Sequence, residues 1–150
     1  MPTPEDTRLY LDVMLGGLVS ILRMVGYDTA YALDRGVEAD DLIAAAAESE
    51  GRVLLTRDQE LAARAPESLL VESLDPDAQL AELAAAGFEL ELTEPTRCSR
   101  CNGRLDRIER GPGPENGPDP AEQPVWRCPD CGQYYWIGSH WAHLRAQLPD

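Results

Sequence analysis

Short apolar runs alternate with longer amphipathic stretches along the first part of the chain. The apolar runs predict buried strands over residues 8–13, 27–33, 52–56 and 68–72. The longer stretches predict helices, each followed by a Gly or Pro that ends it, over residues 15–25, 40–50, 59–65 and 75–86. Phe88, Leu90 and Leu92 then alternate with glutamates, which predicts a half-exposed edge strand.

Strands and helices that take turns at this spacing indicate an α/β fold, with a parallel sheet flanked by helices. The pattern ends near Pro95, where cysteines, arginines and turn residues replace it. We therefore expect two units, residues 1–95 and 96–150. The Pro- and Gly-rich segment 111–124 of the second unit is expected to be a mobile loop.

Charge separates the two units further. All 13 basic residues are Arg, and 27 acidic residues bring the formal net charge of the 150-residue chain to -14. Residues 1–96 carry the whole excess, with 6 Arg against 20 acidic residues, whereas residues 97–150 carry 7 of each. Such a surface disfavours non-specific binding of nucleic acid and predicts a halophilic, salt-adapted protein. GC-rich codon usage, which also favours Arg over Lys, is the alternative explanation.

The chemistry expected of the four cysteines depends on whether the protein resides in a reducing or an oxidising compartment. No run of 18 apolar residues predicts a membrane span, and the opening MPTPEDTR lacks the layout of a signal peptide, so we expect a cytoplasmic protein with no membrane contact. In that reducing compartment paired cysteines favour a metal site over disulfides. Two C-x-x-C turns, 26 residues apart, predict a closed structural Zn²⁺ site with the ligands Cys98, Cys101, Cys128 and Cys131. A pair of redox dithiols is the alternative, and it would require a thioredoxin-like βαβ context.

Basic and aromatic residues surround the cysteines. Arg97, Arg100 and Arg104 lie around the first pair, and Trp136 and His140 follow the second. Guanidinium groups bind phosphates and bases stack on rings, so these residues are predicted to contact single-stranded nucleic acid. The alternative for the aromatic residues is that they form the core of a small zinc ribbon. Ligation of a second metal by His140 is less favoured, because four thiolates already complete a zinc site.

Three aspartates lie at the ends of predicted elements. Asp12 ends the first strand, Asp58 follows the third, and Asp40 opens the helix between them. If the first and third strands are neighbours in a parallel sheet, these carboxylates meet at one edge, where a cation would have to neutralise them. Oxygen ligands suit Mg²⁺ or Mn²⁺, which can activate water for attack on a phosphate. Asp41 is an alternative to Asp40, and the alternatives to metal binding are helix-dipole complementation by these two residues and capping by Asp75.

Several motifs resemble the Mut-seven C-terminal RNase family. In the first unit they are DVMLGGL from residue 12, LRMVGYDT from residue 22 and GRVLLTRD from residue 51. WRCPDCG and YWIGSHW in the tail are similar to that family's zinc ribbon, so the likeness spans roughly residues 8–145. The resemblance implies a PIN-like nuclease domain followed by a zinc ribbon, and hence a metal-dependent ribonuclease acting on RNA.

The resemblance also implies roles for individual residues. Matched by position, the catalytic acids are Asp12, Asp40 and Asp58. In the motif that contains Asp58, Thr56 would hold the turn and Arg57 would contact a phosphate. Many PIN-like nucleases carry a further acid at a strand end. The residue available here is Asp75, which opens the helix predicted over residues 75–86.

Two other functions are compatible with the sequence. One is a non-catalytic RNA- or ribosome-binding adaptor, in which the acids serve solubility alone. The other is a zinc-ribbon module that binds a protein partner through exposed aromatic residues. The oligomeric state is not indicated by any pattern in the sequence.

Overall fold

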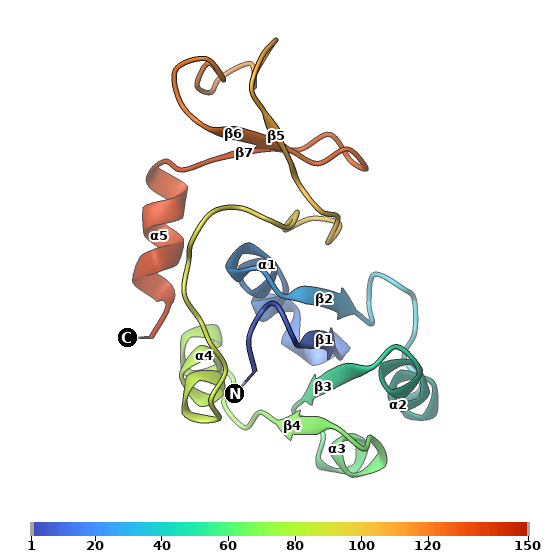
Figure 1. The fold of residues 1–150 in the computed structure, drawn as a ribbon. Helices are drawn as coiled ribbons and strands as arrows, with labels where there is room; N and C mark the ends of the chain where they lie inside the picture. Colours follow the sequence, from blue (N-terminus) through green and yellow to red (C-terminus); the bar gives the residue numbers. More distant parts are fainter. Residues whose placement is uncertain (1, 150) are drawn as a thin grey trace.

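A four-stranded parallel sheet forms the centre of the protein, as a computed structural model describing residues 2–149 shows (Figure 1). The strand order is β2-β1-β3-β4, and every neighbouring pair is parallel. The strands are β1 (Arg8–Leu11), β2 (Asp28–Tyr31), β3 (Arg52–Thr56) and β4 (Ser68–Leu70). The α/β fold with a parallel sheet flanked by helices is therefore confirmed.

Helices cover both faces of the sheet. They are α1 (Gly16–Val25), which follows a 3₁₀ turn η1 (Val13–Leu15), and then α2 (Asp40–Ser49), α3 (Gln59–Arg64) and α4 (Pro76–Ala85). Leu9 and Leu11 of β1 belong to the apolar cluster formed with α1 and α4. Tyr10 points to the opposite face and packs in the cluster formed with α2 and α3. Alternate residues of β1 thus face different helices, which explains why both Leu9 and its neighbour Tyr10 are buried.

The edge strand predicted at residues 88–92 is wrong. Phe88 and Leu92 are buried and Glu89 and Glu91 are exposed, so the alternation does describe burial. The backbone, however, does not pair with the sheet: the Glu89 N–H donates to the Pro2 carbonyl at 2.9 Å. A segment that covers a hydrophobic core along one side produces the same pattern as a strand, because burial alone sets the period.

The C-terminal part forms a small antiparallel sheet in the order β5-β6-β7, followed by a helix. Its elements are β5 (Asp106–Ile108), β6 (Val125–Arg127), β7 (Tyr134–Trp136) and α5 (Ser139–Gln147). Trp126, Tyr135 and Trp141 belong to the same apolar cluster as the α1 and α4 side chains. Helix α5 returns towards α4 (Figure 1), where Gln147 Nε2 lies 3.5 Å from Asp77 Oδ1. The two predicted units therefore share one hydrophobic core across residue 95.

Chain topology marks one edge of the parallel sheet as the place for a site. After β1 the chain turns to the face covered by α1, and after the neighbouring β3 it turns to the face covered by α3. The carboxyl ends of two adjacent strands whose connections diverge form a topological switch point, where parallel sheets place their ligand sites. Within the described residues, no helix has the length and apolar character needed to cross a membrane.

Candidate active site and metal centre

Asp12 and Asp58 lie together at the switch point. Leu11 pairs with Leu55 in the parallel register, so Asp12 and Thr56 leave the sheet side by side. The Asp12 N–H donates to the Leu55 carbonyl at 3.3 Å, which continues the ladder by one residue. The first and third strands are therefore neighbours, which is the condition under which Asp12 and Asp58 meet.

A buried hydroxyl connects the two acids. Thr56 is fully buried, and its Oγ1 donates to Asp12 Oδ2 and accepts from the Asp58 N–H at 3.0 Å. The other carboxylate oxygen of Asp12 accepts from the Met14 N–H at 3.0 Å. Asp58 caps the N-terminus of α3 and accepts the Glu60 N–H at 2.9 Å. Asp12 is thus fixed by a donor from its own turn and by Thr56, and Asp58 by backbone amides of α3.

Asp12 has an unfavourable electrostatic environment for a carboxylate. Only 4% of the residue is exposed to solvent. Burial raises the pKa of Asp12, and the negative charges of Asp58 and Asp40 raise it further, against the opposing hydrogen bonds of Thr56 and Met14. A cation near these acids would remove the repulsion.

The structure distinguishes the neighbouring acids. Asp40 is the first residue of α2, is half-buried and is close enough to act on the charge of Asp12. Asp41 is exposed and forms an ion pair with Arg64 of α3. Asp75 begins α4 and accepts the Ala78 N–H at 3.2 Å, as the capping alternative predicted. Of these neighbouring acids, Asp40 is the one whose charge acts on Asp12.

The carboxylate oxygens of Asp12, Asp40 and Asp58 lie farther apart than the ligand atoms of a bound metal ion. Over residues 2–149, the one group of three or more His, Cys, Asp or Glu side chains with ligand atoms within 4.8 Å of one another is Cys98, Cys101, Cys128 and Cys131. A cation shared by Asp12, Asp40 and Asp58 would have to draw their oxygens closer. The predicted clustering of the four cysteines is confirmed.

The cysteine geometry fits a metal site. Each C-x-x-C turn, Cys98–Cys101 with the residue after it and Cys128–Cys131 with the residue after it, is called a knuckle. Sulfur atoms of opposite knuckles lie 3.5 Å apart in two pairs, Cys98 with Cys131 and Cys101 with Cys128. This is far longer than a disulfide bond and close to the edge, about 3.8 Å, of a tetrahedron with Zn–S bonds of about 2.3 Å. The four cysteines are free thiols that could hold a metal ion.

The two knuckles have the same backbone design. Asn102 N–H donates to the Cys98 carbonyl at 2.9 Å, and Gly132 N–H donates to the Cys128 carbonyl at 2.8 Å. Both residues adopt positive φ, 71° for Asn102 and 82° for Gly132. A left-handed residue at this point turns the chain back, and Gly and Asn tolerate that conformation best.

Local hydrogen bonds prepare one thiol to bind a cation. Burial raises the pKa of Cys98, but hydrogen bonds from the Tyr135 hydroxyl and from backbone N–H groups outweigh it and lower the pKa to about 7. Tyr135 Oη lies 3.1 Å from Cys98 Sγ and also accepts the Ser99 N–H at 2.9 Å. Burial and the neighbouring thiols raise the pKa of Cys101. Four thiolates together would therefore require a metal to balance their charge.

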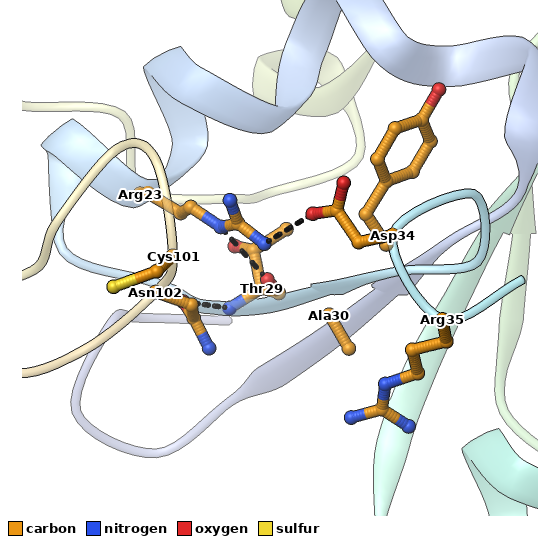
Figure 2. Close-up of a pocket in the computed structure, with 8 residues that line it drawn as sticks. Arg23, Thr29, Ala30, Asp34, Arg35, Cys101 and Asn102 are labelled. Atoms are coloured by element: carbon orange, nitrogen blue, oxygen red, sulfur yellow. Dashed lines mark hydrogen bonds and ion pairs between the residues drawn. The ribbon is translucent and has the colours of Figure 1, made fainter. Parts of the chain in front are cut away.

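The first knuckle docks on the edge of the parallel sheet (Figure 2). Asn102 Oδ1 accepts the Thr29 N–H of β2 at 2.9 Å, and Asn102 Nδ2 donates to Asp28 Oδ1 at 2.6 Å. Arg23 of α1 is buried and donates to the Thr29 carbonyl at 3.0 Å and to the Ser99 carbonyl at 3.1 Å. These bonds join the metal centre to the domain that holds the acids.

Two of the predicted RNA-contacting arginines are engaged inside the protein. Arg57 donates to the Ser73 carbonyl at 3.1 Å and so secures the loop after β4. Arg97 donates to the Asn102 carbonyl at 3.0 Å, and its guanidinium lies 3.7 Å from Asp28. Both side chains support the fold in this structure.

The remaining predicted contacts differ in access. Arg100 and Arg104 are exposed, and Arg100 donates to Gln133 Oε1 at 3.0 Å. Trp136 is half-buried and packs edge-on against His140, with 5.8 Å between ring centroids. Gly117 of the 111–124 loop also lies against the Trp136 ring. Trp136 thus serves ribbon packing, in line with the core alternative, whereas Arg100 and Arg104 are open to solvent.

Sequence reasoning missed Arg23, Asn102 and Tyr135. Arg23 carried a signal, because it is a lone charge inside an otherwise apolar helix and a buried charge requires partners. Asn102 directly follows the first cysteine pair, where it is an ordinary turn residue, but Asn at a positive-φ position also offers a side-chain amide. The role of Tyr135 depends on contacts between distant residues and had no local signal.

A family model described as the Mut7-C RNAse domain matches residues 7–148, nearly the whole chain. No curated protein and no solved structure matches the chain significantly.

Proposed function

The chain belongs to the Mut7-C RNAse domain family, and on that premise we propose that it is a metal-dependent ribonuclease that hydrolyses RNA phosphodiester bonds. The observation that carries the proposal is the pair formed by Asp12 and Asp58 at the switch point, joined through the Thr56 hydroxyl. Asp40 completes the predicted catalytic set. A family of this kind indicates an RNA-related, nuclease-like function, and this edge of the sheet is where such a function would be placed.

The protein's own groups supply position and charge. Thr56 holds the Asp12 carboxylate against the carboxyl ends of two strands, and the α3 amides hold Asp58. The three carboxylates fit a hard divalent cation in ligand type and in charge. Mg²⁺ or Mn²⁺ bound there would activate water and stabilise the charge that develops on the phosphate. Asp58 is the less buried member of the joined pair and the one that solvent can reach.

The cysteine site is proposed to hold a structural Zn²⁺. Four thiolates leave no open coordination position, so the ion would supply folding energy rather than chemistry. Through Arg23 and Asn102 it would also fix the first knuckle on β2. The exposed ribbon arginines, Arg100 and Arg104, then become candidates for guiding RNA.

The test is cleavage of labelled single-stranded RNA by the full chain with Mn²⁺ at high KCl. Asp12→Asn and Asp58→Asn should each reduce the rate by at least 10²-fold, on the order of an essential catalytic group. Asp41→Asn is the matched control, because it removes an aspartate that pairs with Arg64 on the protein surface. Unchanged turnover in the Asp12 and Asp58 variants would end the catalytic proposal.

A second arm tests how the acids are positioned. Thr56→Val removes the shared hydroxyl at nearly constant shape, and Thr56→Ser retains it. We expect the valine variant to lose activity by on the order of 10²-fold and the serine variant to keep most of it. Equal activity in both would show that the hydroxyl has no part in placing the carboxylates.

A non-catalytic RNA-binding adaptor is the second candidate. The spacing of the acids favours it, since Asp12, Asp40 and Asp58 are not gathered within coordinating distance as the cysteines are. In that case the zinc-bound, well-folded protein would bind RNA and leave it intact with Mn²⁺ or Mg²⁺. The cleavage assay separates the two functions directly.

A further inference from the structure

A groove whose lining contains none of the three proposed catalytic acids runs along α1. It consists of two cavities, of about 210 and 330 Å³, whose linings share Arg23, Tyr31 and Asp34. One end reaches Gly16 at the start of α1, and the other reaches Arg100 on the first cysteine knuckle. The groove thus lies between the parallel sheet and the ribbon (Figure 2).

The groove begins next to the candidate active site. Tyr31 is the last residue of β2 and pairs in register with Leu11, the residue before Asp12. The Tyr31 hydroxyl donates to the Val13 carbonyl at 3.1 Å, one residue after Asp12. The end of the groove at Tyr31 therefore lies beside the turn that holds Asp12.

The charge of the groove is opposite to that of the molecule. Its lining contains Arg23, Arg35 and Arg100 against one acid, Asp34, in a chain with 13 Arg and 27 acidic residues. Two guanidinium nitrogens of Arg35 donate to the two carboxylate oxygens of Glu50, at 2.5 and 3.0 Å. Arg23 is buried in the fold. Arg35 and Arg100 are both exposed, but Arg35 is already paired with Glu50, whereas Arg100 forms no ion pair among the described residues and is the one that can meet a phosphate.

The remaining lining suits an unpaired base. The Tyr31 ring is half-buried, and the exposed Ser20 of α1 lies in the same lining. Thr29 N–H points outwards from the sheet to Asn102, so the Tyr31 N–H, two residues on, points outwards as well. An aromatic face beside hydroxyl and amide donors offers stacking and hydrogen bonds to a base that is not in a duplex.

We propose that this groove binds the single-stranded RNA segment adjoining the cleaved bond, with a base on Tyr31 and a phosphate on Arg100. The proposal rests on the ribonuclease function proposed above and gives the substrate a path, from the acids along α1 to the first knuckle. Arg23 lies beneath this path, where its contacts with Asp34 and the knuckle carbonyls maintain the groove.

Binding is tested separately from cleavage, in the full zinc-loaded chain carrying Asp12→Asn. Fluorescence anisotropy with a labelled single-stranded oligouridylate gives the dissociation constant over a range of KCl concentrations. Arg100→Ala should raise this constant roughly tenfold and lower the salt slope by about one ion. Tyr31→Leu should raise it roughly tenfold with the slope unchanged, whereas Tyr31→Phe, which keeps the ring, should bind like the parent.

Arg110→Ala is the matched control, because Arg110 is exposed in the same ribbon and does not line the groove. Equal weakening by Arg100→Ala and Arg110→Ala would overturn the proposal, as would unchanged affinity in the Arg100 and Tyr31 variants. Cleavage by the unsubstituted chain together with such unchanged affinities would remove the groove and leave the ribonuclease. Groove-dependent binding without any cleavage would support the groove and remove the ribonuclease.

Discussion

Single side chains at the switch point are arranged for charge rather than for stability. Asp12 is placed in a buried position beside two further carboxylates, and its pKa is raised chiefly by that burial. Thr56 holds it there by a hydrogen bond, so the repulsion is not relieved by movement. Groups kept in such an environment are typical of functional sites, because selection for stability alone would replace them.

The burial of Asp12 and its repulsion by neighbouring carboxylates predict that its replacement changes the free energy of unfolding. A carboxyl whose pKa is raised in the folded state stabilises the fold while it is protonated, and that contribution is lost as the pH rises through the folded-state pKa. Asp12→Asn removes the charge, so without divalent cations the variant should match or exceed the parent at pH 7, by up to about 1 kcal/mol. Its advantage should shrink towards acidic pH.

Urea unfolding between pH 4 and pH 8, with and without Mn²⁺, measures both effects. Mn²⁺ should stabilise the parent and leave Asp12→Asn unchanged. A variant less stable than the parent at every pH, or stabilised equally by Mn²⁺, would contradict this account of the acid cluster.

The first knuckle and strand β2 are joined chiefly by the side chain of Asn102. Each knuckle has one residue with positive φ, Asn102 in the first and Gly132 in the second, but only Asn102 carries a side-chain amide, which reaches the edge of β2. Arg23 reinforces this contact from α1. The knuckle is therefore attached to the sheet by specific polar bonds in addition to the shared apolar core.

Asn102→Gly tests that attachment, because Gly accepts the same backbone conformation and removes the amide. The buried Thr29 would lose the partner of its N–H, which should cost about 1–3 kcal/mol of unfolding free energy. Gly132→Asn is the reciprocal control and should change stability by less than about 1 kcal/mol, since a Cβ there meets nothing closer than 3.5 Å. Chemical unfolding at constant zinc gives both values, and similar losses in the two variants would refute a docking role for Asn102.

At the level of elements, the sequence was informative where burial is periodic along the chain. Strand β3 and helix α1 are predicted by their apolar runs, and the meeting of Asp12 with Asp58 follows from strand order. The strand expected at 88–92 was wrong because a covering segment shares the strand period. Docking by Asn102 and Arg23 could not be predicted, because it joins residues more than 70 positions apart.

The molecule as a whole combines a shared core with an uneven charge. The acidic excess belongs to residues 1–96, while Trp126 and Trp141 of the neutral part are buried in the core of the acidic part. Unfolding should therefore occur as one transition, in which self-repulsion of the acidic surface opposes the compact state.

Salt should act on this repulsion. If the charge reflects salt adaptation, raising KCl from low to multimolar concentration should stabilise the protein by about 1–3 kcal/mol, a rise of several degrees in the unfolding midpoint. Calorimetry of the zinc-loaded protein measures it, and sucrose at matched water activity controls for general exclusion effects. A midpoint indifferent to KCl would leave codon usage as the explanation for the Arg-only composition.

The Asn102 bond to Thr29 has one more consequence. Strand β2 is one of the two outer strands of the parallel sheet, and an outer strand with free N–H and C=O groups is a template on which another chain can add. The knuckle occupies that template with a side-chain amide in place of a strand. Metal starvation would therefore uncover the border of the sheet and be seen first as self-association, before the loss of any chemistry.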